Sequence, residues 1–262
     1  MEKPDDDVVA KDASDNVVDK EPSNKNPLNK QLTIVFVLPG NTFTNRFLIS
    51  WTSLFNYCLS HEITPLVTNH VSDNVYEVYN RCLGGNNKLG TKQKPFNAEI
   101  KYDYVMWIDS QKMFNVPQFT ELLKHDKDIV SGLYLYDDTK RFNVIEHLDV
   151  EYFKQNGGNK YFTPDDLAER RKASETDFLM KVDYTSMGWM LIKHGVFETM
   201  KYPWFYPELK ECDYTDPSGN LVEHCEYLPP DYCFSKKAKE MGFELFVDTR
   251  IIVGNECNVV LG

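Results

Sequence analysis

Short continuous runs of apolar residues alternate along this chain with segments in which apolar residues recur at helical spacing. The run QLTIVFVLPG ends in Pro39 and Gly40, which is typical of a buried parallel strand followed by a tight turn. Residues 45–61 have the spacing of an amphipathic helix, residues 63–70 form a second strand-like run, and a helix is expected from Ser72, whose hydroxyl can cap it. This β-α-β-α order predicts an α/β fold, with a central mostly parallel sheet flanked by helices.

The same alternation continues to the end of the chain. Residues 84–97 are loop by composition, and residues 202–230 are predicted to form a long aromatic loop with a functional role. The other predicted elements are a strand ending at Ile108, a helix at 116–126 with Pro117 near its start, a strand at 127–136, a short helix at 163–171, a strand-turn-strand-helix unit at 178–200, a helix at 230–242 and a strand at 243–254.

Residues 1–31 differ in composition from the rest. They are rich in Asp, Lys, Asn, Ser and Pro and contain almost no large apolar side chains, so they cannot bury enough surface to offset the entropy of ordering. We expect a flexible acidic leader, with a partner-binding tail as the alternative. Residues 32–262 are expected to form one domain.

The net charge of −11 argues against broad contact with nucleic acid, which needs clustered Lys and Arg. A nucleotide can still bind locally if a metal ion offsets its phosphate charge. No uncharged apolar run reaches 18 residues, and the first thirty residues lack the apolar centre of a secretory signal. The sequence therefore predicts a cytoplasmic protein with no membrane span.

The six cysteines contain no CxxC pair, and a chain of 262 residues does not need disulfides for stability, so free thiols are expected. A zinc site at His224, Cys225 and Cys233 is the alternative, although the spacing of these residues matches no standard site.

Asp109 is the first candidate functional residue. It directly follows the apolar run VMWI, which reads as a buried strand. Ligands of open α/β sheets sit at the carboxyl ends of strands, so Asp109 is a candidate ligand-binding residue.

Two more polar landmarks, PPDYCF and VGNE, also lie next to apolar segments. With these, the chain resembles the GT-A family of nucleotide-sugar-dependent glycosyltransferases, particularly the small GT2-like enzymes of bacteria, phages and large algal DNA viruses. The likeness covers roughly residues 32–258. It is carried by YDYVMWIDSQ, KDIVSGLY, VDYTSMGWMLIKHGVFETMKYPWF and DYCFSKKAKEMGFELFVDTRIIVGNE.

The resemblance implies an enzyme, a hexosyl- or pentosyltransferase. It would move a sugar, with inversion, from a nucleotide-diphosphate-sugar donor to a hydroxyl of a glycan or glycoconjugate acceptor. Asp231 matches the general base of inverting members, since a carboxylate there can take the proton of the attacking hydroxyl. The alternative for Asp231 is an N-cap of the following helix. The implied donor-binding residues are Pro39, Gly40, Ser72, Arg81, Asp109, Ser110 and Gln111, with simple capping by Ser72 and a surface position for Arg81 as alternatives.

The resemblance also implies a divalent metal, Mn²⁺ or Mg²⁺, that bridges the diphosphate of the donor. Asp109 keeps the first acid of the Asp-x-Asp motif, whereas Gln111 stands at the second and Asn255 at the position of a further His ligand, with Glu256 next to it. Neutral carboxamides are weaker ligands, so metal affinity should fall. The metal would then be weakly held, held through Glu256, or partly replaced by basic side chains.

Acceptor binding is assigned to aromatic side chains, whose faces stack on sugar rings, and to a glycine that leaves room for the acceptor. The residues are Tyr134, Tyr136, Gly188, Trp189, Trp204 and Tyr206, with a place in the core as the alternative for the tryptophans and tyrosines. Two other functional classes stay open, a catalytically weak binding protein for nucleotide sugars or glycans and a nucleotidyltransferase. The latter lacks its Gly-rich, Lys-containing phosphate loop. A retaining mechanism is the alternative within the enzyme class.

Overall fold

The computed structural model describes residues 31–174 and 176–257. Its centre is a seven-stranded sheet in which five strands run in one direction and β9 and β7 run in the other. In spatial order the strands are β2 (Ile63–Thr68), β1 (Leu32–Val37), β3 (Tyr104–Ile108), β9 (Trp189–Lys193), β5 (Ile129–Leu133), β14 (Leu245–Ile252) and β7 (Leu179–Val182). The predicted α/β fold with a mostly parallel sheet is confirmed.

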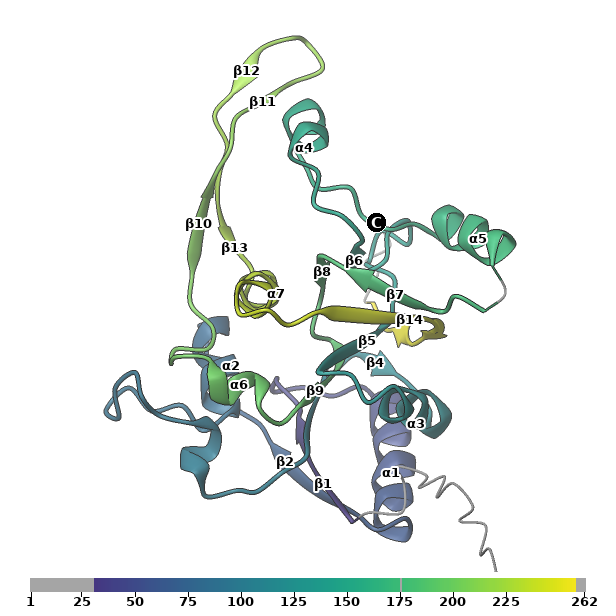
Figure 1. The fold of residues 1–262 in the computed structure, drawn as a ribbon, viewed down its shortest axis with the longest axis vertical. Helices are drawn as coiled ribbons and strands as arrows, with labels where there is room; N and C mark the ends of the chain where they lie inside the picture. Colours follow the sequence, from purple (N-terminus) through teal and green to yellow (C-terminus); the bar gives the residue numbers. More distant parts are fainter. Residues whose placement is uncertain (1–30, 175, 258–262) are drawn as a thin grey trace, which may run out of the picture.

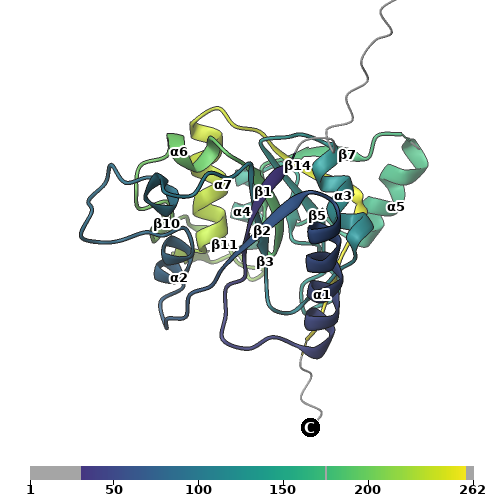
Figure 2. The same cartoon turned by 90° about the horizontal axis from the view of Figure 1, so that it is seen from below.

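Helices cover both faces of this sheet, as Figures 1 and 2 show. One face packs against α1 (Asn45–Ser60) and α3 (Val116–Lys124), and the other against α2 (Val75–Cys82), α6 (Val196–Thr199) and α7 (Pro230–Glu240). Successive side chains of a strand point to opposite faces, so the central strands need apolar side chains on both faces to fill both layers. In β1, Ile34 and Phe36 belong to the first layer and Val35 and Val37 to the second.

The remaining helices and ladders surround the sheet. The helical segments are η2 (Pro95–Ala98), α4 (Val150–Asn156) and α5 (Pro164–Ala173). The two-stranded ladders pair β4 (Lys112–Met113) with β15 (Gly254–Asn255), β6 (Val144–Ile145) with β8 (Tyr184–Thr185), β10 (Glu208–Glu211) with β13 (Cys225–Leu228), and β11 (Tyr214–Thr215) with β12 (Leu221–Val222).

Local capping explains where several helices begin. Asn115 forms a capping box with Gln118 at the start of α3, with proline in the first turn, and Thr163 does the same with Asp166 for the predicted helix α5. The prediction that Ser72 caps α2 is wrong. Asn74 is the cap, and its side chain accepts from two backbone N–H groups of the first turn.

The segment 202–230 is not a simple loop. Its β10–β13 and β11–β12 ladders form an arm, defined here as residues 208–228, that extends away from the sheet and passes α4 (Figure 1). The Lys210 ammonium packs 3.5 Å from the centre of the Phe153 ring of α4. The predicted leader lies outside the described residues except for Gln31, and among residues 31–174 and 176–257 no helix is long and apolar enough to cross a membrane.

Candidate active site

A cleft of about 380 Å³ lies where the parallel strands β1, β2 and β3 end. Its walls come from the residues after each strand and from the start of α2, so the cleft has the position that ligands occupy in open α/β sheets. Six of the predicted donor-binding residues line it together: Pro39, Gly40, Ser72, Asp109, Ser110 and Gln111.

The turn after β1 is built for this cleft. Gly40 has φ +127°, a conformation that side chains rarely permit, and a Cβ there would stand 3.4 Å from the Ser110 hydroxyl. The Asn69 side-chain amide donates to the carbonyls of Leu38 and Gly40, at 2.6 and 2.7 Å, and so holds the turn against the end of β2.

Asp109 stands at the inner end of the cleft, where its backbone N–H donates to the carbonyl of Gly188 at 3.0 Å. Its side chain is 35% exposed, and one oxygen lies 3.7 Å from the ammonium of Lys112, whose own side chain is only 4% exposed. That ammonium also donates to Asn255 Oδ1 at 2.8 Å and faces the Tyr134 ring, 3.8 Å from its centre. Burial lowers the pKa of Lys112, and the Asp109 carboxylate opposes that effect.

Gly188 makes room for this cluster. A Cβ at position 188 would lie 2.5 Å from Asp109 Oδ2, 2.6 Å from the Tyr134 hydroxyl and 2.7 Å from Lys112 Cε. The glycine is therefore required by three side chains of the protein itself, which differs from the predicted clearance for an acceptor.

Asp231 lies in a second cavity, of about 520 Å³, which is lined mainly by tyrosines and polar side chains. Its members include Tyr136, Asp138, Arg141, Tyr161, Tyr184 and Ser186. The Tyr184 hydroxyl donates to Asp231 Oδ2 at 3.1 Å. The predicted N-cap role is wrong, because Pro229 is the cap of α7 and Asp231 belongs to its first turn.

The environment of Asp231 suits a proton acceptor. Burial raises the pKa of Asp231, and the negative charge of Asp109 raises it further, while hydrogen bonds from Ser186, Tyr184 and the Tyr232 N–H oppose the rise. A carboxylate with a raised pKa is a better base near neutral pH.

Tyr134 and Ser186 connect the two cavities. The Tyr134 hydroxyl donates to Ser186 Oγ at 2.7 Å and accepts from the N–H of Gly188 at 3.3 Å. Since Ser186 hydrogen bonds to Asp231, a continuous set of contacts runs from Lys112 beside the cleft to the carboxylate of α7.

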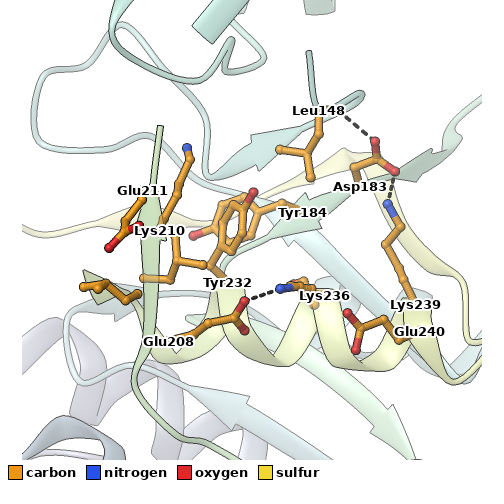
Figure 3. Close-up of a pocket in the computed structure, with 13 residues that line it drawn as sticks. Leu148, Asp183, Tyr184, Glu208, Lys210, Glu211, Tyr232, Lys236, Lys239 and Glu240 are labelled. Carbon is orange, nitrogen blue, oxygen red and sulfur yellow. Dashed lines mark hydrogen bonds and ion pairs between the residues drawn. The ribbon is translucent and has the colours of Figure 1, made fainter. Parts of the chain in front are cut away.

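Helix α7, which carries Asp231, is fixed from two sides. Figure 3 shows Lys236 of α7 paired with Glu208 of the arm, and Lys239 paired with Asp183, the residue before β8. These pairs border a further cavity of about 500 Å³, and Tyr184 forms part of its wall as well as part of the Asp231 cavity. The arm therefore contacts the helix that carries Asp231.

Other predicted site residues lie elsewhere. Arg81 pairs with Glu77 at 3.5 Å and donates to the carbonyl of Gly85 at 3.1 Å, in a separate cavity that Tyr206 also lines. Trp189 and Trp204 are fully buried and present no face to a sugar. Lys112, Tyr184 and Ser186 were not predicted from the sequence, although Lys112 directly follows the acidic motif.

Two of the predicted metal ligands meet through the backbone, where the N–H of Glu256 donates to the carbonyl of Gln111 at 3.0 Å. Within residues 31–174 and 176–257, no three His, Cys, Asp or Glu side chains are grouped to hold a metal ion, so the alternative zinc site is unsupported. Asp109 and Asn255 both contact the Lys112 ammonium, and a divalent ion placed between them would meet that like charge. Gln111 faces the cleft, and Glu256 has a buried carboxylate oxygen without a hydrogen-bond partner among the described residues. All six cysteines are free, as predicted.

No protein-family model and no curated protein matches this sequence. Among solved structures, A197 from STIV is similar over 87% of both chains, with 12% identity and a TM-score of 0.50. Glucosyl-3-phosphoglycerate synthase from Mycobacterium tuberculosis, solved with Mn²⁺ and UDP-glucose, is similar over 88% of this chain and 72% of its own, with 12% identity and a TM-score of 0.38. Mannosyl-3-phosphoglycerate synthase from Rubrobacter xylanophilus is similar over 77% of this chain and 88% of its own, with 11% identity and a TM-score of 0.30. The likeness is one of fold.

Proposed function

We propose that this chain is an inverting glycosyltransferase that uses a nucleotide-diphosphate-sugar donor and a hydroxyl acceptor. One observation carries the proposal: two carboxylates, Asp109 in the strand-end cleft and Asp231 in the tyrosine-lined cavity, lie close enough for the charge of the first to raise the pKa of the second. A cleft for the leaving nucleotide beside a base for the incoming hydroxyl is the arrangement that glycosyl transfer needs.

In this proposal the nucleotide occupies the cleft, whose volume falls in the range of small-molecule sites. The turn at Pro39 and Gly40 and the hydroxyls of Ser72 and Ser110 provide polar contacts without bulky side chains. The diphosphate then lies near Asp109, which places the sugar between the cleft and Asp231.

The chemical step joins the two cavities. The acceptor oxygen forms a bond to the anomeric carbon as the bond from that carbon to the phosphate oxygen breaks, and the electron pair leaves with the nucleoside diphosphate. The acceptor proton passes to the Asp231 carboxylate. Tyr184 and Ser186 hold that carboxylate by hydrogen bonds and so orient it toward the acceptor.

The acceptor is proposed to occupy the Asp231 cavity, where Tyr136, Tyr161 and Tyr184 supply aromatic surface and Arg141 and Asp138 supply polar contacts. Aromatic faces pack against the apolar faces of sugar rings, while charged groups hydrogen bond to hydroxyls. The acceptor class is therefore a glycan or glycoconjugate.

The test is a panel of nucleotide sugars with and without Mn²⁺, scored for donor hydrolysis and for transfer to glycan acceptors. We expect Asp109→Ala and Asp231→Ala each to abolish transfer and to retain the thermal stability of the parent, whereas Asp213→Ala, an exposed position on the arm, should behave as the parent does. A fully active Asp231→Ala enzyme would remove Asp231 from the role of base. The anomeric configuration of the product, read by NMR, separates inversion from retention.

The alternative of a binding protein is tested by the same panel. Its motivation is the set of neutral side chains at 111 and 255, where the resemblance implies stronger ligands. Binding of a nucleotide sugar by calorimetry, with no hydrolysis or transfer of any donor under any condition, would favour that function over the enzyme.

A further inference from the structure

The donor cleft has an unusual balance of charge. Its lining includes two carboxylates, Asp73 and Asp109, but no lysine or arginine. A nucleoside diphosphate carries several negative charges, and one more develops on the leaving group as the sugar departs. Apart from the imidazole of His70, which also lines the cleft, positive charge must therefore come from outside the lining, either from a divalent ion or from a neighbouring side chain.

Lys112 is a cation outside the cleft lining that contacts Asp109. Its ammonium lies 3.7 Å from Asp109 Oδ2 and 2.8 Å from Asn255 Oδ1, which belong to two of the four side chains expected to meet a metal. The β4–β15 ladder places these partners, because it pairs Lys112 directly with Asn255. The surrounding residues hold the Lys112 side chain in place, since the Tyr134 ring packs against the ammonium and Gly188 leaves the space that the lysine side chain fills.

We infer that Lys112 is the resident cation of the donor site and that it replaces a divalent metal between Asp109 and Asn255. This inference rests on the proposed function. A buried fixed charge is effective at this position, because the surrounding low-dielectric protein screens it far less than water does. The ammonium also neutralises Asp109, so that the inner end of the cleft does not repel a diphosphate.

The same arrangement explains the two neutral side chains at the motif positions. A lysine held by one carboxylate and one carboxamide already has its charge balanced, and further carboxylates would make the cleft repel the donor. Gln111 and Asn255 are therefore suited to an ammonium, whereas a divalent ion prefers several negatively charged oxygens.

The experiment compares metal binding with donor hydrolysis in the full-length chain after dialysis against EDTA. Mn²⁺ binding is measured by the loss of the free-ion EPR signal. We expect the parent to bind no Mn²⁺ and to hydrolyse its donor equally well with EDTA or Mn²⁺ present. Lys112→Met, which keeps the length but removes the charge, should lower hydrolysis by about 10²-fold. Lys112→Ala, which vacates the position, should gain Mn²⁺ binding.

The matched control is Lys193→Met, which removes a lysine that is paired with Asp126 at the opposite end of β9. It should change neither metal binding nor hydrolysis. Thermal melting of each variant separates a loss of charge from a loss of fold. A parent protein that binds Mn²⁺ and loses hydrolysis in EDTA overturns the inference, as does a folded Lys112→Met variant with parental hydrolysis.

The two hypotheses fail in different ways. If no donor is hydrolysed by any variant, the proposed function fails, and the EPR titration still decides the position of the cation. Mn²⁺ binding by the parent then counts against Lys112 as the resident cation. This holds also if Glu256→Gln removes the binding, because such a loss would place the ion on the unpartnered Glu256 oxygen. Mn²⁺ binding that appears only in Lys112→Ala supports Lys112 as the resident cation.

Discussion

Gly188→Ala is the smallest change that reaches the centre of the proposed site. The backbone itself permits alanine, because Gly188 does not have the positive φ that favours glycine. The new methyl group would, however, meet Asp109 Oδ2 at 2.5 Å, the Tyr134 hydroxyl at 2.6 Å and Lys112 Cε at 2.7 Å. The effect of the substitution is therefore purely one of space.

The magnitude follows from these three distances. Carbon atoms in good contact are about 3.5–4.0 Å from their neighbours, so each side chain must move by about 1 Å. Overpacking of this kind costs about 2 kcal/mol, which lowers the melting temperature of a chain of this size by about 4–8 °C. A misplacement of about 1 Å in a catalytic group lowers the rate by about 10²-fold.

The assay combines thermal melting with donor hydrolysis and transfer. Gly158→Ala is the matched control, because Gly158 also lacks a positive φ and its added Cβ would meet nothing within 4 Å. We expect the control to match the parent in both measurements. A Gly188→Ala variant with parental stability and rate would show that the three side chains are not packed around position 188, and the reasoning would be refuted.

Tyr184→Phe removes a hydrogen bond that lowers the pKa of Asp231, so the acid limb of the pH profile of kcat/KM should move to higher pH; an unshifted limb would contradict the role of Asp231 as base. Asp109→Asn should lower the pKa of Asp231 in a carboxyl NMR titration, since it removes the charge that raises it, and a higher or equal value would count against their proximity. Asp248→Ala should cost about 3–5 kcal/mol in urea unfolding at pH 7, because the fully buried Asp248 pairs with His125 and Arg250. Burial alone would raise the pKa of Asp248, but those hydrogen bonds hold it far below 3.8, so the stability they add is present above that pH and lost as pH falls. The gap between parent and variant should therefore shrink in acid, and a constant gap would argue against the pairing.

The central strands were predictable because both faces of the sheet are covered. A strand such as β1, with apolar side chains at every position except Thr33, leaves little choice other than a buried parallel strand. The position of Asp109 was equally predictable, since an acid directly after such a strand must emerge at the carboxyl edge of the sheet.

The arm was missed because its strands are short and mostly exposed, so they carry no apolar pattern. The turn DPSG at 216–219 was the available signal, since Asp, Pro, Ser and Gly are typical turn residues. Asn74 was overlooked as the cap of α2 because Ser72 and Asp73 precede it and are also acceptable caps.

The partners of Lys112 could not be predicted. A lysine after an acidic motif reads as a surface residue, since lysine is rarely buried without a partner. Its burial depends on Asn255 and Tyr134, which come from distant segments, and on the empty space at Gly188. Trp189 and Trp204 were predicted to contact a sugar but are fully buried. The sequence could not show this, because a chain rich in aromatic residues does not reveal which rings face outward.

The short β4–β15 ladder ties two points that are more than half the chain apart, and this has a consequence for biosynthesis. When a ribosome has released residues 1–200, the strand before Asp109 and the strand after Gly188 are already available to pair, yet Asn255 has not been made. The nascent protein thus contains the Asp109 carboxylate and the Lys112 ammonium before their partner, the Asn255 side-chain amide, has been made. The Lys112 contacts become complete only with the last described strand, so a chain cut after Ile252 would keep all seven strands of the sheet and lose Asn255.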